Sequence, residues 1–99
     1  MKISRMLFMI LCLNLCSCIH KSNLTEGIEN FRIQNYRNAF IQLKPLADKG
    51  EPDAEYAVGY MYYYGYGVVE DKEQAAIWIH RAADAGQAQA RGALSLLGR

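Results

Sequence analysis

The chain has 99 residues, enough for one small domain, and carries 11 basic and 10 acidic side chains for a formal charge of +1. No basic stripe interleaves with aromatic residues, which argues against nucleic acid as a partner. The apolar run near the N-terminus is shorter than the roughly 20 residues that a membrane-spanning helix needs.

The first 17 residues have the order of a secretory signal peptide. Lys2 and Arg5 precede an apolar run at residues 6–15, and small or polar residues follow it. This order predicts that the chain is exported and that residues 1–17 are removed. Removal would take Cys12 and Cys16 away, leaving Cys18 as the one remaining cysteine.

Residues 15–18 read LCSC and resemble a bacterial lipobox, in which a small residue precedes an invariant cysteine. In proteins of that kind the cysteine sulfur receives diacylglycerol, cleavage makes the cysteine the first residue, and its amine is acylated. The resemblance implies that Cys18 is lipidated and that residues 18–22 are a short tether. With Ile19 next, it also implies a lipid anchor in the outer membrane of a bacterial cell envelope, facing the periplasm. The alternative is ordinary secretion in which Cys18 takes no part.

Beyond the tether, apolar residues recur at helical spacing. A first stripe at residues 24–31 follows Ser22 or Asn23, either of which suits an N-cap. Gln34 and Asn35 then make a polar break. A second stripe ends at Gly50, a residue typical of helix C-termini, and consists of Tyr36, Ala39, Phe40, Leu43, Leu46 and Ala47.

Three more helices are predicted after Gly50. Pro52 suits a first helical turn, and the stripe behind it is Ala54, Ala57, Val58, Met61 and Tyr62. Gly65 and Gly67 then break the chain. Asp71 can cap a fourth helix that Gly86 stops, with a stripe of Ala75, Trp78, Ile79, Ala82 and Ala83. The last stripe is Ala90, Ala93, Leu94 and Leu97. No segment alternates with period two, so the predicted fold is all-α.

The stripes repeat at an offset of 36 residues. The matched pairs include Ala39 with Ala75, Ile41 with Ile77, Ala47 with Ala83, Asp48 with Asp84, Gly50 with Gly86, Ala54 with Ala90, and Ala57 with Ala93. Helix faces and terminating glycines therefore stay in one register. This indicates a helical-repeat protein, in which one helix pair has too few neighbours to bury its apolar faces alone.

Residues 54–90 resemble the Sel-one-like repeat family, which is related to tetratricopeptide repeats. The family pattern is A-x-x-x-L-G-x-x-Y, G-x-G-V, D-x-x-x-A, W and A-A-x-x-G. It is matched here by Ala54, Gly59, Tyr62, Gly65, Gly67, Val68, Asp71, Ala75, Trp78, Ala82, Ala83 and Gly86, while Val58 replaces the leucine. Residues 35–50 resemble the second helix of a preceding unit with a shortened loop, and the segment from residue 87 resembles the first helix of a third.

The resemblance implies an α-solenoid of about two helix pairs plus a terminal helix over residues 23–99. It also implies a scaffold or adaptor that binds another envelope protein, or a second copy of this chain. A small ligand-binding or glycan-binding lipoprotein is the alternative.

Residues 60–67 read YMYYYGYG and supply the candidate contact residues. Tyr62 continues the apolar stripe and is predicted to be core, whereas Tyr56 falls on the other side of the helix, beside Gly59. The candidate protein-binding residues are Tyr60, Tyr63, Tyr64 and Tyr66. Packing between neighbouring repeats would explain the same tyrosines without a partner, and a glycan could stack on them.

No catalytic constellation is present. There is no phosphate-binding glycine loop and no S-x-x-K motif, and His80 has no second ligand at a spacing that suits a metal. The sequence therefore predicts a protein that is not an enzyme, with no cofactor and no metal site.

Overall fold

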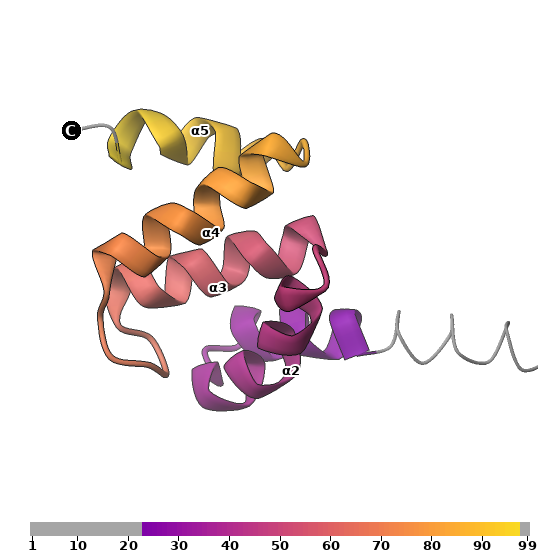
Figure 1. The fold of residues 1–99 in the computed structure, drawn as a ribbon. Coiled ribbons are helices and arrows are strands. Elements are labelled where there is room, and N and C mark those ends of the chain that lie inside the picture. The colour runs from indigo at the N-terminus through magenta and orange to yellow at the C-terminus, as the bar shows by residue number, and fades with distance from the viewer. Residues whose placement is uncertain (1–22, 98–99) are drawn as a thin grey trace, which may run out of the picture.

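The computed structural model describes residues 23–97, and this part of the chain is an array of helices without strands (Figure 1). Residues 23–32 form the first helical segment, and the four helices that follow are α2 (Tyr36–Asp48), α3 (Pro52–Tyr64), α4 (Lys72–Asp84) and α5 (Ala88–Leu97). The predicted signal peptide, Cys18 and the tether lie outside the described residues. Within residues 23–97, no helix has the length and apolar character needed to cross a bilayer.

Consecutive helices pack against each other, so that α3 lies between α2 and α4, and α5 covers the far side of α4 (Figure 1). Asn23 lies within the first helical segment instead of preceding it as a cap. The other predicted helix starts are confirmed. Pro52 occupies the first turn of α3, and the Asp71 carboxylate accepts a hydrogen bond from the Gln74 amide at 3.0 Å.

The two predicted terminating glycines adopt the same conformation. Gly50 has φ +91° and Gly86 has φ +93°, which is the left-handed region that glycine occupies without steric cost. In both turns the amide that follows the glycine bonds to a carbonyl five residues back, that of Leu46 at 3.1 Å and that of Ala82 at 3.0 Å. The offset of 36 residues is therefore a repeat of structure as well as of sequence.

The apolar stripes form two buried clusters. The first joins α2, α3 and Trp78 of α4, and the first helical segment packs against it through half-buried side chains. The second lies between α4 and α5. The middle stripes are confirmed as the core, with the difference that Tyr36, Phe40 and Tyr62 lie half-buried at its edge. The first stripe and Ala93, Leu94 and Leu97 of the last stripe are also half-buried and pack against the two clusters. The Phe40 and Tyr62 rings meet edge to face at 5.7 Å.

Two glycines let the helices of each pair approach closely. A Cβ atom on Gly59 would lie 2.6 Å from the side chain of Ile79, and one on Gly27 would lie 2.6 Å from that of Leu43. Leu43 and Ile79 are one repeat apart, so residues 23–32 with α2 form the same kind of helix pair as α3 with α4. The connecting loop is shorter in the first pair, residues 33–35, than in the second, residues 65–71. Two helix pairs and a terminal helix are thus confirmed.

Candidate functional site

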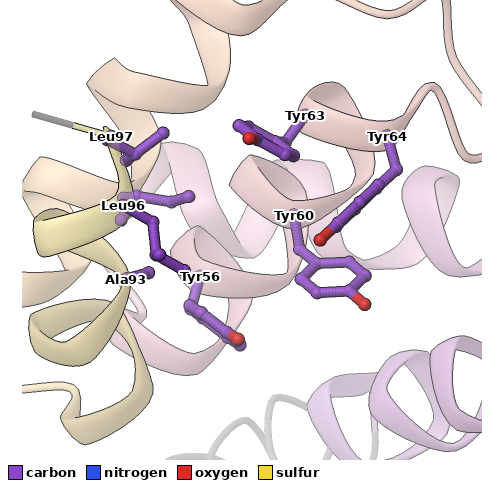
Figure 2. Close-up of a pocket in the computed structure, with 8 residues that line it drawn as sticks. Tyr56, Tyr60, Tyr63, Tyr64, Ala93, Leu96 and Leu97 are labelled. Atoms are coloured by element: carbon purple, nitrogen blue, oxygen red, sulfur yellow. The ribbon is translucent and has the colours of Figure 1, made fainter. Parts of the chain in front are cut away.

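The tyrosines of α3 line one side of the helix along most of its length. Tyr56, Tyr60 and Tyr63 are spaced so that they fall on one face of an α-helix, and Tyr64 lies beside them. The opposite face of α3 is filled by the buried stripe, which turns these rings away from the first core cluster. Figure 2 shows these four tyrosines on α3 and, across from them, Ala93, Leu96 and Leu97 on α5; the Tyr60 ring points away from α5.

Tyr60 is the centre of the aromatic cluster. Its ring centroid lies 4.7 Å from that of Tyr64, 6.2 Å from that of Tyr56 and 5.4 Å from that of Phe31. The Phe31 contact is edge to face, with an interplanar angle of 81°. Rings at these separations attract one another beyond the effect of area burial. The cluster therefore ties the first helical segment to α3.

Tyr66 reaches the cluster from the loop after α3. Gly65 and Gly67 flank it with φ values of +71° and +73°, and a Cβ on Gly67 would lie 2.8 Å from the backbone of Tyr36. The loop therefore runs against the start of α2. The Tyr66 ring stacks on Tyr36 at 4.5 Å and on Tyr64 at 5.3 Å, nearly parallel to both.

A hollow lies between α3 and α5, and we call it the apolar hollow. It has a volume of about 120 Å³. An apolar cavity of about 150 Å³ can hold benzene, so the somewhat smaller apolar hollow has the size of one aliphatic side chain. Its lining residues are Tyr56, Tyr60, Tyr63, Tyr64, Ile79, Ala93, Leu96 and Leu97.

A second hollow of about 300 Å³ adjoins the first at Tyr56. Its lining is mostly apolar, and we call it the polar hollow for the carboxylate and two amides that it contains. It lies where the first helical segment, the start of α3 and the start of α5 meet. A carboxylate and two amides face aromatic and aliphatic side chains there. The lining residues are Ile28, Phe31, Asp53, Tyr56, Ala57, Gln87 and Gln89.

Burial raises the pKa of the Tyr56 and Tyr60 hydroxyls above the ordinary value of 10.0. Neighbouring tyrosines, Tyr64 foremost, add to the shift because each anion would repel the next. Both hydroxyls therefore stay protonated at neutral pH. They can donate hydrogen bonds to a partner and keep the free surface wettable.

The structure brings the four predicted contact residues together, with different exposure. Tyr64 is the most open, at 50% exposed, whereas Tyr60, Tyr63 and Tyr66 are half-buried. Lys72 extends over the Tyr63 ring, with its Nζ atom 5.0 Å from the ring centroid. Each of the four predicted residues belongs to one connected aromatic surface.

Sequence reasoning missed the side of the site that α5 provides. Leu96 is 70% exposed and lies off the apolar stripe of its helix, so its spacing carried no signal. The repeat offset did carry one, because Leu96 is 36 residues after Tyr60. Phe31 and Tyr36 were assigned to helix packing, and both also touch the predicted contact residues. No group of three or more potential metal ligands occurs within residues 23–97.

Comparison with known proteins agrees with the repeat geometry. Residues 52–87 match the model of the Sel1 repeat, and this range covers α3, the glycine loop and α4. No curated protein and no solved structure matches the chain. Sel1 repeats generally mediate protein–protein interactions and are generally non-catalytic. Residues 52–87 therefore match one complete Sel1 repeat, which supports a Sel1-like repeat protein.

Proposed function

We propose that this chain is a lipid-anchored protein of the bacterial envelope that binds another protein through the aromatic surface of α3 and the apolar hollow beside it. The observation that carries the proposal is the apolar hollow, which tyrosines of α3 and aliphatic side chains of α5 line together. The Sel1 repeat supports an interaction module.

The aromatic character of this surface also favours a protein partner. Aromatic rings that line a hollow are favourable contact residues, because they offer a large area with few rotors to order. Tyr64, the most open ring, is the natural first contact.

The test is a double substitution on this surface, Tyr63→Ser with Tyr64→Ser. We expect the variant to keep its helical circular dichroism and to lose the partner, because it removes two rings from the rim of the hollow without touching the buried stripe. The measurement is quantitative mass spectrometry of proteins captured from detergent-solubilised envelope of the source bacterium.

The matched control is Ile41→Ser with Ile77→Ser, which removes two exposed apolar side chains from α2 and α4. A genuine partner is captured by wild-type protein and by this control, and is absent with the tyrosine variant. If the tyrosine variant captures the same proteins as wild type, or unfolds, the proposed binding surface is wrong.

A glycan-binding function is the second candidate, and the polar hollow is the observation that favours it. Asp53, Gln87 and Gln89 lie there beside the Phe31 and Tyr56 rings. Carboxylates, amides and aromatic faces are groups that bind sugar hydroxyls and stack on sugar rings. Titration with soluble envelope glycan fragments, followed by tyrosine fluorescence, separates the two functions.

The lipid anchor gives a separate prediction, which rests on the LCSC motif. Two or more acyl chains hold a protein on a bilayer stably, whereas one chain does so only marginally. Cys18→Ala should therefore move the protein from the membrane fraction to the soluble fraction and leave its helical circular dichroism unchanged. Wild-type protein that is already soluble, with no lipid mass on Cys18, would disprove the anchor.

If Cys18 is lipidated, the tether of four residues that follows it reaches roughly 14 Å from the membrane. The partner would then have to approach the membrane surface itself. An envelope partner embedded in or lying on the same membrane fits this restriction better than a freely diffusing one.

A further inference from the structure

We propose that the segment bound by this surface has two parts, an apolar side chain that fills the apolar hollow and a lysine or arginine that pairs with Asp53. This inference rests on the proposed function and adds the chemistry of the partner. It follows from the register of α3, the charge of Asp53 and the hydrogen bonds within the polar hollow.

Asp53 continues the line of tyrosines toward the start of α3. Asp53, Tyr56, Tyr60 and Tyr63 are spaced three, four and three residues apart, so they share one face of the helix. A helix rises about 1.5 Å per residue, which places Asp53 roughly 10–15 Å along the axis from Tyr60 and Tyr63. A bound segment therefore spans that distance between its two parts. An extended segment covers it with about three to five residues, at about 3.3 Å each.

The lining of the two hollows carries a negative charge at the start of α3. Asp53 is exposed and is the one charged residue that lines either hollow. Its carboxylate accepts a hydrogen bond from the neutral Gln87 amide at 3.3 Å, and none of the ion pairs found within residues 23–97 includes it. Glu51 at the N-cap adds a second carboxylate at this end, whereas Glu55 is buried and interacts with Arg81. A cationic side chain is the complement of this end.

At the other end of α3, Lys72 lies over the Tyr63 ring, 5.0 Å from its centroid, and is 3.8 Å from the Glu70 carboxylate. The Tyr63 ring therefore already has a cation of the chain itself over it, whereas no ion pair found within residues 23–97 occupies Asp53. Of the two ends, the one at Asp53 is thus open to a basic side chain of the partner.

The polar hollow is poorly suited to sugar hydroxyls, because the chain itself uses its central amide. Gln87 donates to Asp53 and to the Gln89 side chain, and its carbonyl oxygen accepts from the Ala90 amide at 2.7 Å. These three contacts use both amide protons of the side chain and one of the two lone pairs of its oxygen. The Asp53 carboxylate has remaining acceptor capacity, which suits a cation more than a neutral hydroxyl. These contacts favour a protein segment over a glycan at the site.

The experiment uses the full chain in detergent and a phage-displayed library of random dodecapeptides as the probe. We expect selected peptides to combine an aliphatic or aromatic residue with a lysine or arginine a few positions away. One selected peptide and its analogue with glutamine in place of the basic residue are then synthesised. Their Kd values are measured for wild-type protein, Asp53→Asn and the matched control Asp84→Asn, which removes the same charge from an exposed position at the end of α4.

Asp53→Asn should weaken binding of the basic peptide by about two- to fivefold at low salt, the range of an exposed ion pair. It should leave the glutamine analogue unchanged, and Asp84→Asn should change neither peptide. Tyr63→Ser with Tyr64→Ser should weaken both peptides by at least about tenfold, because it removes the contact surface.

The outcomes separate the inference from the function on which it rests. Selected peptides without basic residues, or an Asp53→Asn variant that binds the basic peptide as wild type does, overturn the inference; loss of binding in the tyrosine variant then still supports the proposed surface. If the tyrosine variant binds every peptide normally, the proposed surface fails as well. A library that yields no binders, together with binding of envelope glycan fragments, overturns both in favour of a glycan site.

Discussion

Trp78→Ala is expected to unfold the domain. Trp78 is 5% exposed and is the residue of α4 that belongs to the first core cluster, so its ring joins the second helix pair to the first. Replacing a buried tryptophan by alanine costs about 3–5 kcal/mol. A small domain has about 5–15 kcal/mol of total stability, and arrays with few repeats lie at the low end. Thermal unfolding followed by circular dichroism at 222 nm measures the effect.

The contacts of the Trp78 ring suggest a second, milder substitution that tests the same prediction. Lys44 Nζ lies 5.1 Å and Arg81 Cζ lies 4.9 Å from the ring centroid, and such cation–π contacts add to the loss in the alanine variant. The indole N–H is buried and has no hydrogen-bond partner among residues 23–97. Trp78→Phe removes this unpaired donor and keeps most of the apolar ring.

We therefore expect Trp78→Phe to stay folded and to lose less stability than Trp78→Ala. Leaving a donor unpaired in the interior costs about 1–3 kcal/mol, and relief of that cost offsets part of the lost packing. An alanine variant that melts close to wild type would show that the ring contributes little to the core. Trp78 would then be a candidate for partner binding.

The helices could be predicted from the sequence because local chemistry determines their ends. Proline at a first turn, aspartate at an N-cap and glycine at a left-handed position each act within a few residues of the boundary they set. Pro52, Asp71, Gly50 and Gly86 are therefore readable without knowing what packs nearby. The repeat offset adds independent support, because the same turn geometry occurs twice.

The site was harder to predict because distant segments complete it. The spacing of the tyrosines was enough to assign them to one side of α3. It did not identify the residues that lie opposite them. Phe31 lies in the first helix pair, whereas Tyr60 lies in the second. Leu96 lies on α5, the helix after the second pair. Helical periodicity reports which residues share a face and not which helix lies opposite. Leu96 also lies off its own apolar stripe, and its offset of 36 residues from Tyr60 was the one signal that pointed to it.

Exposed apolar residues show that a match between repeats does not imply burial. Ile41 and Ile77 match at the repeat offset, yet they are 63% and 45% exposed. Agreement between repeats therefore indicates equivalent positions in the array and does not by itself indicate burial. The role of Gly27 could not be predicted from the sequence either, since a glycine inside a helix usually weakens the helix. In this chain Gly27 marks the close approach of Leu43 in the first pair, and that role appears only beside Gly59 and Ile79.

The close approach of helices within a pair gives the last prediction, a comparison of Gly59→Ala with Gly92→Ala. Both glycines lie inside helices, so both substitutions gain the same helix propensity, about 1 kcal/mol. On Gly59 the new methyl group lies 2.6 Å from Ile79 Cγ1 and 3.2 Å from the Ala75 carbonyl oxygen, whereas on Gly92 it meets nothing within 4 Å. Overpacking of a core typically costs about 1–3 kcal/mol.

The propensity gain cancels in the difference between the two variants, which leaves the packing cost alone. Gly59→Ala should therefore be less stable than Gly92→Ala by about 1–3 kcal/mol, and Gly92→Ala should be more stable than wild type. Urea unfolding curves with equal slopes measure the difference directly. Because Ala75 contributes a backbone atom, α3 and α4 must move apart to accept the methyl group, and rotation of a side chain alone cannot relieve the contact. Equal stability of the two variants would show that this helix pair is loosely packed and that Gly59 is not what allows its close approach.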